Sequence, residues 1–184
     1  MKRFILLFLL LNVSVTAHAD DVRMSTSKGD IYLKVHSELA PETAANFLRL
    51  VNSGWYDGKQ FYRVVPGFVI QAGANRDDIV QPNVPGEYLE QKSPLHRRGA
   101  VGLARDTDPN SGNSEFYIAL DDIHRLDGRY TVFAYVVEGF DVIDSIAQVE
   151  LKETYIVYEG QDVAFHQPIE PVVIHSAKVI THDE

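Results

Sequence analysis

One stretch constrains the fold of this chain more than any other: residues 61–73, which read Phe-Tyr-Arg-Val-Val-Pro-Gly-Phe-Val-Ile-Gln-Ala-Gly. Residues 61–65 and 68–72 are rich in aromatic and β-branched side chains, and the Pro-Gly pair between them is typical of a turn. The stretch therefore predicts two strands joined by a bend. Arg63 and Gln71 interrupt it and place hydrogen-bond donors beside apolar surface. Since a single Arg or Gln in a strand usually faces solvent, these two residues alone do not identify a site.

The stretch resembles the signature of the cyclophilin-type peptidyl-prolyl isomerases: an aromatic, any residue, Arg-Val, an aliphatic, Pro-Gly-Phe, two further residues, Gln and a Gly-rich turn. Other segments similar to this family occur in the family's order, at residues 39–47, 56–58, 114–118, 126–128 and 132–133. The resemblance covers about residues 22–181. It implies a mainly β fold, a closed eight-stranded antiparallel barrel capped by two α-helices. It also implies an enzyme that isomerises X-Pro bonds without a covalent step.

The N-terminus has the three parts of a secretory signal: a basic head at residues 1–3, an apolar run at 4–11, and small residues at Ala17 and Ala19. The apolar run reaches Val15 at most, which is shorter than the roughly 20 residues that span a bilayer. We therefore predict a signal peptide over residues 1–19, cleavage after Ala19, a single isomerase domain over residues 20–184, and a periplasmic or secreted protein. An uncleaved membrane anchor is the alternative.

Composition limits the partners of the mature chain. Without residues 1–19 it carries 15 basic and 26 acidic residues, a net charge of −11 with histidine neutral. Such a surface repels nucleic acid and anionic membranes. Cysteine is absent, the histidines lack metal-ligand spacing, and the segment 106–112 is only loosely similar to a calcium loop because its glycine comes one place late. We expect a monomer with no metal and no cofactor.

Periodicity places the other elements. Alternating residues predict a hairpin over 22–25 and 31–36, and apolar residues at helical spacing predict helices over 41–53 and 139–149. Apolar runs predict strands at 100–104, 116–120, 130–137 and 172–181. Residues 74–99 are expected to be a long irregular segment, and residues 151–167 carry no clear pattern.

The resemblance also implies roles for individual residues. Arg63 is the expected catalytic electrostatic group, Gln71 positions the substrate backbone, and Phe68 completes the catalytic set. The expected substrate-binding residues are Val69, Ala104, Arg105, Glu115, Tyr117, Leu126 and Tyr130. The proline pocket is expected to be lined by Phe68 and by four of these residues: Val69, Tyr117, Leu126 and Tyr130. Strand alternation puts Phe68 on the face opposite Val69 and Gln71, so Phe68 joins the site only if it lies at the bent start of the strand. Ordinary barrel core is the alternative role for Phe68, Tyr117 and Leu126.

Five positions depart from the family's usual residues: Val69 replaces a common Met, Glu115 a Gln, Tyr117 a Phe, Arg125 a Trp or Phe, and Tyr130 a His. These changes predict isomerase activity with an altered substrate preference. Glu115 suggests a further hypothesis, that its carboxylate pairs with Arg63 and competes with substrate. On that hypothesis Glu115→Gln raises catalytic efficiency.

The predicted function is isomerisation of X-Pro bonds in exported proteins, assisting their folding, with proline-containing polypeptide segments as partners. The alternative is a proline-binding or chaperone-like barrel with little turnover. A barrel that holds a ligand in its interior is less consistent with the sequence, because its many large apolar side chains would fill the lumen.

Overall fold

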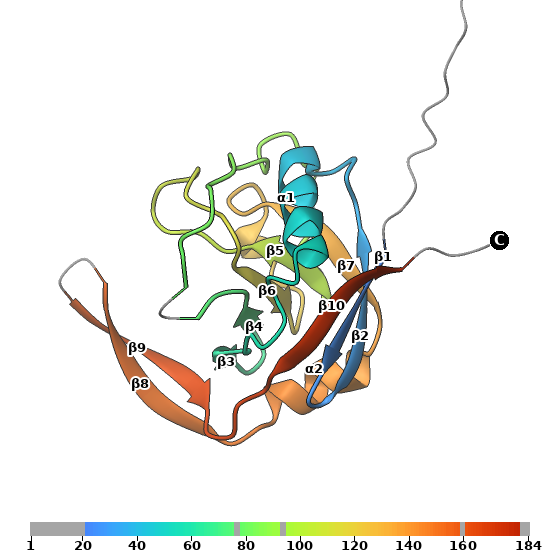
Figure 1. Ribbon diagram of the computed structural model, residues 1–184. Helices are drawn as coiled ribbons and strands as arrows, with labels where there is room; N and C mark the ends of the chain where they lie inside the picture. The colour runs from blue at the N-terminus through green and yellow to red at the C-terminus, as the bar shows by residue number, and fades with distance from the viewer. Residues whose placement is uncertain (1–20, 76–77, 93–94, 159–160, 181–184) are drawn as a thin grey trace, which may run out of the picture.

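The computed structural model describes residues 21–75, 78–92, 95–158 and 161–180 (Figure 1). The predicted signal peptide lies outside these residues. The elements in chain order are β1 (Asp21–Thr26), β2 (Gly29–Val35), α1 (Pro41–Asn52), β3 (Arg63–Val65), β4 (Val69–Ala72), β5 (Ala100–Leu103), β6 (Phe116–Ala119), the short 3₁₀ helix η1 (His124–Leu126), β7 (Val132–Glu138), α2 (Phe140–Ala147), β8 (Leu151–Tyr158), β9 (Gln161–Pro168) and β10 (Ile174–Ile180).

Eight of the strands form one antiparallel sheet in the order β10-β1-β2-β7-β5-β6-β4-β3. The predicted hairpin is β1 and β2, which turn at Gly29 with a backbone φ of 129°, a value that favours glycine. The predicted strands around the Pro-Gly turn are β3 and β4, and the four later strands are β5, β6, β7 and β10. The sequence therefore predicted every strand of the main sheet to within about three residues.

The sheet curls but does not close, which corrects the prediction of a closed barrel. Its end strands are β10 and β3, and no ladder between described residues joins them. The chain before β3 bonds there instead, with the Gly58 N–H donating to the Ile174 carbonyl at 2.8 Å and the Phe61 N–H donating to the Val172 carbonyl at 2.9 Å. Gln60 and Val173 form an isolated antiparallel bridge here, and no ladder between described residues continues it into β3.

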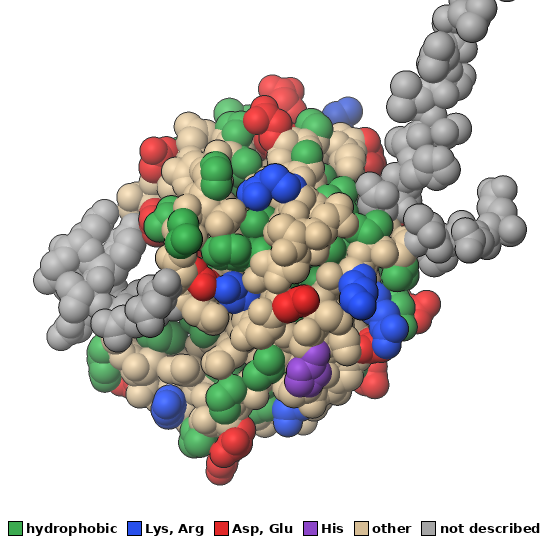
Figure 2. Space-filling model, in the orientation of Figure 1, with side chains coloured by type: hydrophobic (Ala, Val, Ile, Leu, Met, Phe, Trp, Pro, Cys, Tyr) green, Lys and Arg blue, Asp and Glu red, His purple; other side chains and the backbone are tan. Residues whose placement is uncertain are grey.

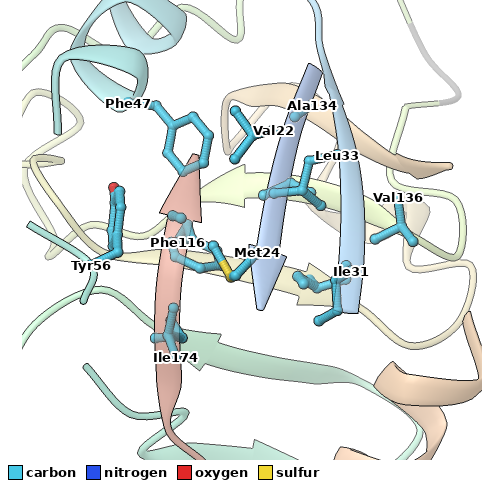
Figure 3. Close-up of a cluster of buried hydrophobic side chains, with 14 of the residues drawn as sticks. Val22, Met24, Ile31, Leu33, Phe47, Tyr56, Phe116, Ala134, Val136 and Ile174 are labelled. Carbon is cyan, nitrogen blue, oxygen red and sulfur yellow. The ribbon is translucent and has the colours of Figure 1, made fainter. Parts of the chain in front are cut away.

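The two helices lie at opposite ends of the curled sheet (Figure 1). Pro41 occupies the first turn of α1, where its missing N–H is no loss, and the helix ends before Gly54. The apolar face of α1 buries Phe47, whose ring lies 5.0 Å from that of Phe133 and 6.0 Å from that of Phe116. Figure 3 shows Phe47 of α1 together with residues of β1, β2, β6, β7 and β10 in one cluster. This cluster fills the inside of the curl.

The segment without a clear sequence pattern forms the hairpin β8–β9, a two-stranded sheet of its own. Residues 74–99, where described, contain no helix or strand, as expected. No helix within the described ranges is long and apolar enough to cross a membrane. On the face shown in Figure 2, side chains of both charges are scattered among apolar and polar ones.

Candidate active site

A row of side chains runs across three neighbouring strands on the outer face of the sheet. Arg63 on β3 pairs with Gln71 on β4, and Gln71 pairs with Tyr117 on β6. Successive residues of a strand point to opposite faces, so the neighbouring Val64 and Ile70 point into the core while this row points out of it. Directly opposed residues on neighbouring strands lie within contact distance. Strand register alone therefore brings the predicted catalytic pair together beside an aromatic ring.

Arg63 and Gln71 are joined by a hydrogen bond, in which Arg63 Nη1 donates to Gln71 Oε1 at 3.0 Å. The amide nitrogen of Gln71 donates in turn to Glu115 Oε2 at 2.9 Å, and the hydroxyl of Tyr62 donates to the same oxygen at 2.6 Å. The amide of Gln71 is thus held at both ends, which fixes its orientation. Burial raises the pKa of the Tyr62 hydroxyl, and the charge of Glu115 raises it further.

The Glu115 carboxylate does not form the ion pair with Arg63 that the sequence suggested. Among the carboxylates that the structure describes, none lies within ion-pair distance of Arg63. The Glu115 carboxylate is engaged by Gln71 and Tyr62 instead. A direct Glu115–Arg63 pair was therefore the wrong expectation, because the side chain of Gln71 lies between the two charges.

Phe68 lies in the turn before β4, with its N–H donating to the Val65 carbonyl at 2.9 Å. Gly67 before it has a φ of 69°, which an L side chain rarely adopts. Phe68 is therefore free of the strand alternation that would have turned it inward, and it packs against the same apolar cluster as Val69. The condition set for Phe68 by the sequence is met.

This apolar cluster is separate from the main core and lies on the outer face of the sheet. It contains Phe68, Val69, Ala104, Tyr117, Leu126 and Tyr130, all of which were predicted to bind substrate or line the proline pocket. Phe68, Tyr117 and Leu126 belong to this cluster and not to the main core inside the curl. Tyr117 is buried in it, whereas Phe68 and Leu126 are partly buried.

A groove of about 850 Å³ passes beside the cluster and is called here the substrate groove. It is lined by six of the ten predicted site residues and by seven others: Tyr62, Arg63, Gln71, Ala104, Arg105, Asp106, Thr107, Ser111, Asn113, Glu115, Tyr130, Ala164 and Phe165. Phe68, Val69, Tyr117 and Leu126 do not line it, but they adjoin it through Ala104 and Tyr130. The groove thus offers a guanidinium and an amide on one wall and apolar surface on another.

Two arginines cover the aromatic rings of this region. The Arg105 guanidinium carbon lies 4.5 Å from the centre of the Tyr130 ring, and that of Arg125 lies 4.4 Å from the centre of the Phe68 ring. Such cation–π contacts contribute about 0.5–1 kcal/mol at exposed sites. Arg125, which departs from the family's usual aromatic residue, therefore covers Phe68 by stacking a guanidinium on it.

A buried chain of hydrogen bonds holds Tyr117 from beneath. The Tyr117 hydroxyl lies 2.8 Å from His96 Nε2, and His96 Nδ1 lies 2.6 Å from Asp127 Oδ1. Asp127 also accepts the backbone N–H of His96 at 2.9 Å. A carboxylate only accepts, so His96 carries its proton on Nδ1, and the Tyr117 hydroxyl donates to Nε2. Sequence reasoning missed this chain of hydrogen bonds, because no local pattern links its members: His96 and Tyr117 are 21 residues apart, and Tyr117 and Asp127 are 10 residues apart.

The position of Tyr117 also depends on Gly102, the next member of the cross-strand row. A Cβ at Gly102 would lie 2.2 Å from the Tyr117 ring. Burial raises the pKa of the Tyr117 hydroxyl well above its usual value. Burial also lowers the pKa of His96, and the neighbouring Asp127 offsets part of this decrease. Both groups are therefore neutral at pH 7, and the apolar cluster carries no charge from them.

Comparisons with known proteins agree with this geometry. The family model for cyclophilin-type peptidyl-prolyl cis-trans isomerases matches residues 21–179. Peptidyl-prolyl cis-trans isomerase A of Dickeya dadantii is 37% identical over 166 residues, covering 86% of this chain and 84% of the relative. An isomerase of Streptomyces antibioticus is 36% identical and covers 86% and 98% of the two chains. A Cryptosporidium parvum cyclophilin crystallised with the dipeptide Ala-Pro superposes with a TM-score of 0.71 at 25% identity, covering 88% of this chain and 99% of that one.

The curled antiparallel sheet, its two end helices and the outward Arg–Gln pair define a peptidyl-prolyl cis-trans isomerase. More particularly, the chain belongs to the cyclophilin-type family of these enzymes.

Proposed function

We propose that this protein isomerises X-Pro bonds in exported polypeptides and so assists their folding, with Arg63, Gln71 and Phe68 as its catalytic residues. The observation that carries the proposal is the Arg63–Gln71 pair beside the outer apolar cluster. The crystallisation of the Cryptosporidium parvum relative in the presence of the dipeptide Ala-Pro supports a proline-containing substrate.

The chemistry needs electrostatics rather than a nucleophile. Rotation about an X-Pro bond meets a barrier of about 18–20 kcal/mol, because the C–N bond has partial double-bond character. In the twisted transition state this conjugation is lost and the lone pair localises on the prolyl nitrogen. A guanidinium N–H that points at this nitrogen stabilises the twisted form more than the planar one, which lowers the barrier.

The described contacts leave Arg63 able to do this. A guanidinium has five N–H donors, and among the described contacts Gln71 takes one of them. An acceleration of about 10⁵-fold requires about 7 kcal/mol, and a single preorganised donor typically supplies about 3–4 kcal/mol of such a total. The outer cluster supplies apolar surface for the pyrrolidine ring, and Gln71 supplies an oriented amide for the substrate backbone.

Arg63→Ala tests this assignment. With an Ala-Pro peptide in an NMR exchange assay, we expect kcat/KM to fall by about 10²–10³-fold because the donor is lost. The matched control is Arg98→Ala, since Arg98 pairs with Asp144 of α2 and lies outside the groove; it should keep the wild-type rate. A wild-type protein that binds the peptide with negligible turnover would support the alternative of a proline-binding or chaperone-like barrel.

Export is tested separately. The full chain, expressed in a bacterium with two membranes, should be recovered from the periplasm or medium with an N-terminus at Asp20. Recovery of exported protein that still begins with Met1 would contradict cleavage.

A further inference from the structure

The hairpin of β8 and β9, residues 151–168, is called here the arm. Its strands pair over eight positions, from Leu151 with Pro168 to Tyr158 with Gln161. Figure 1 shows it extending away from the curled sheet, with β9 beside β3. Of the arm side chains that the structure describes, Leu151 packs against the main core. Of the other described side chains of the arm, Pro168 is buried, and those of residues 152–155 and 164–167 are half-buried or exposed.

The arm completes a second hollow, called here the arm cleft, of about 880 Å³. One side is lined by Thr154, Tyr155, Phe165 and Gln167 of the arm. The other side is lined by described residues of the body: Trp55, Gln60, Tyr62, Ala74, Asn75, Asp78, Ile79, Val80, Gln81, Asn113, Ser114 and Glu115. The arm cleft and the substrate groove share Tyr62, Asn113, Glu115 and Phe165. The Phe165 ring meets the edge of Tyr62 at 6.4 Å. The two hollows therefore adjoin along these four residues.

The arm cleft gathers apolar side chains that are otherwise exposed. Ile79 and Val80 are 83% and 81% exposed, and Tyr155 on the arm is 60% exposed. All three line this hollow together with Trp55. Single exposed apolar residues are ordinary, but a group of them around a hollow is typical of a binding surface.

The polar side chains of the arm cleft suit a peptide backbone. Amide and hydroxyl groups come from Gln60, Gln81, Asn113, Thr154 and Gln167. Its two carboxylates are already engaged, Asp78 by Lys59 at 2.8 Å and Glu115 by Tyr62 and Gln71. Lys59 compensates the charge of Asp78, whereas Glu115 accepts only from neutral donors, so its negative charge is not compensated. The rest of the lining offers neutral hydrogen-bonding groups and apolar surface, which favours an apolar ligand without negative charge.

We propose that the arm cleft binds apolar residues of the substrate polypeptide that flank the X-Pro pair. The occupant is the same chain whose proline lies in the substrate groove, because the two hollows share a wall. The inference rests on the proposed isomerase function and adds to it a preference for long, apolar, unfolded segments over short peptides.

The experiment compares two substrates. One is an Ala-Pro tetrapeptide, and the other is a peptide of about twelve residues with apolar residues on both sides of the proline, which spans roughly 40 Å when extended. The variants are Ile79→Ser combined with Val80→Ser, and Tyr155→Ser; all three side chains are exposed, so the fold should tolerate them. Leu89→Ser is the matched control, because Leu89 is 78% exposed but lines neither hollow.

For the long peptide we expect the double variant to raise KM about tenfold with kcat unchanged, since burial of apolar side chains gives affinity of this order. The tetrapeptide rate and the Leu89→Ser control should stay within about twofold of wild type. Equal rates for wild type and variants on the long peptide would overturn the inference, as would equal losses on both peptides. If the variants changed the sedimentation of the protein but not its KM, the inference would also be overturned, because the surface would then bind a second copy of this chain. A wild type inactive on the tetrapeptide would instead refute the isomerase function.

Discussion

The hydroxyl of Tyr117 gives a prediction whose size follows from the structure. Tyr117→Phe keeps the ring in the outer apolar cluster but removes the donor to His96 Nε2, at present 2.8 Å away. The His96 side chain is 0% exposed, so water cannot replace this donor without a rearrangement. A buried acceptor left unsatisfied costs about 1–3 kcal/mol. For a domain of this size that loss lowers the melting temperature by about 2–12 °C.

The assay is urea unfolding at pH 7.5, with the free energy of unfolding taken by linear extrapolation. Tyr130→Phe is the matched control, since Tyr130 packs edge-on against Tyr117 at 6.2 Å and its hydroxyl makes no hydrogen bond to a described residue. It should change the free energy by less than about 0.5 kcal/mol. Equal stabilities of the two variants would refute the reasoning, because they would show that the buried hydrogen bond contributes nothing beyond the ring.

Three further predictions follow from the same region. Burial lowers the pKa of His96 in the folded protein, so below about pH 6.5 the unfolded chain binds a proton that the native state does not. The free energy of unfolding of the wild type, measured by urea titration, should therefore decline more steeply from about pH 6.5 to 5 than that of His96→Asn. Parallel curves for the two proteins would contradict this prediction. Glu115→Gln keeps an acceptor for Gln71 and should change kcat/KM by less than about threefold, whereas Glu115→Ala releases Gln71 and should lower kcat/KM by about tenfold. A large gain in Glu115→Gln would support direct competition of the Glu115 carboxylate with substrate for Arg63. Gly102→Ala places a Cβ 2.2 Å from the Tyr117 ring and should lower both the melting temperature and kcat/KM, and unchanged values would show that the ring has room to move.

The sequence predicted that Arg63 and Gln71 lie on two strands joined by a turn, and their pairing depends on strand geometry. Arg63 and Gln71 are eight residues apart with a two-residue turn signal between them, so pairing them across a hairpin requires only the register. The side on which Phe68 lies was uncertain, because strand alternation would have turned it inward. Gly67, with a φ of 69°, places Phe68 in the turn before β4 instead.

Two features could not be predicted, each for a physical reason. The described side chains at the base of the arm, residues 152–155 and 164–167, are half-buried or exposed, so no fully buried face imposes an alternating pattern on them. The chain of Tyr117, His96 and Asp127 joins three segments through tertiary packing, and nothing local in the sequence marks the partners of a buried histidine. Closure of the barrel was overestimated for a related reason, because the pairing of residues 58–61 with residues 172–174 is a tertiary contact that no local pattern marks.

The arm has a consequence for the behaviour of the protein at high concentration. β3 is the last strand of the main sheet, and an uncovered last strand presents unpaired backbone groups that can pair with another molecule. β9 runs beside β3 and limits access to that side. A chain shortened by residues 151–168 would expose this edge, and self-association through it would then compete with folding.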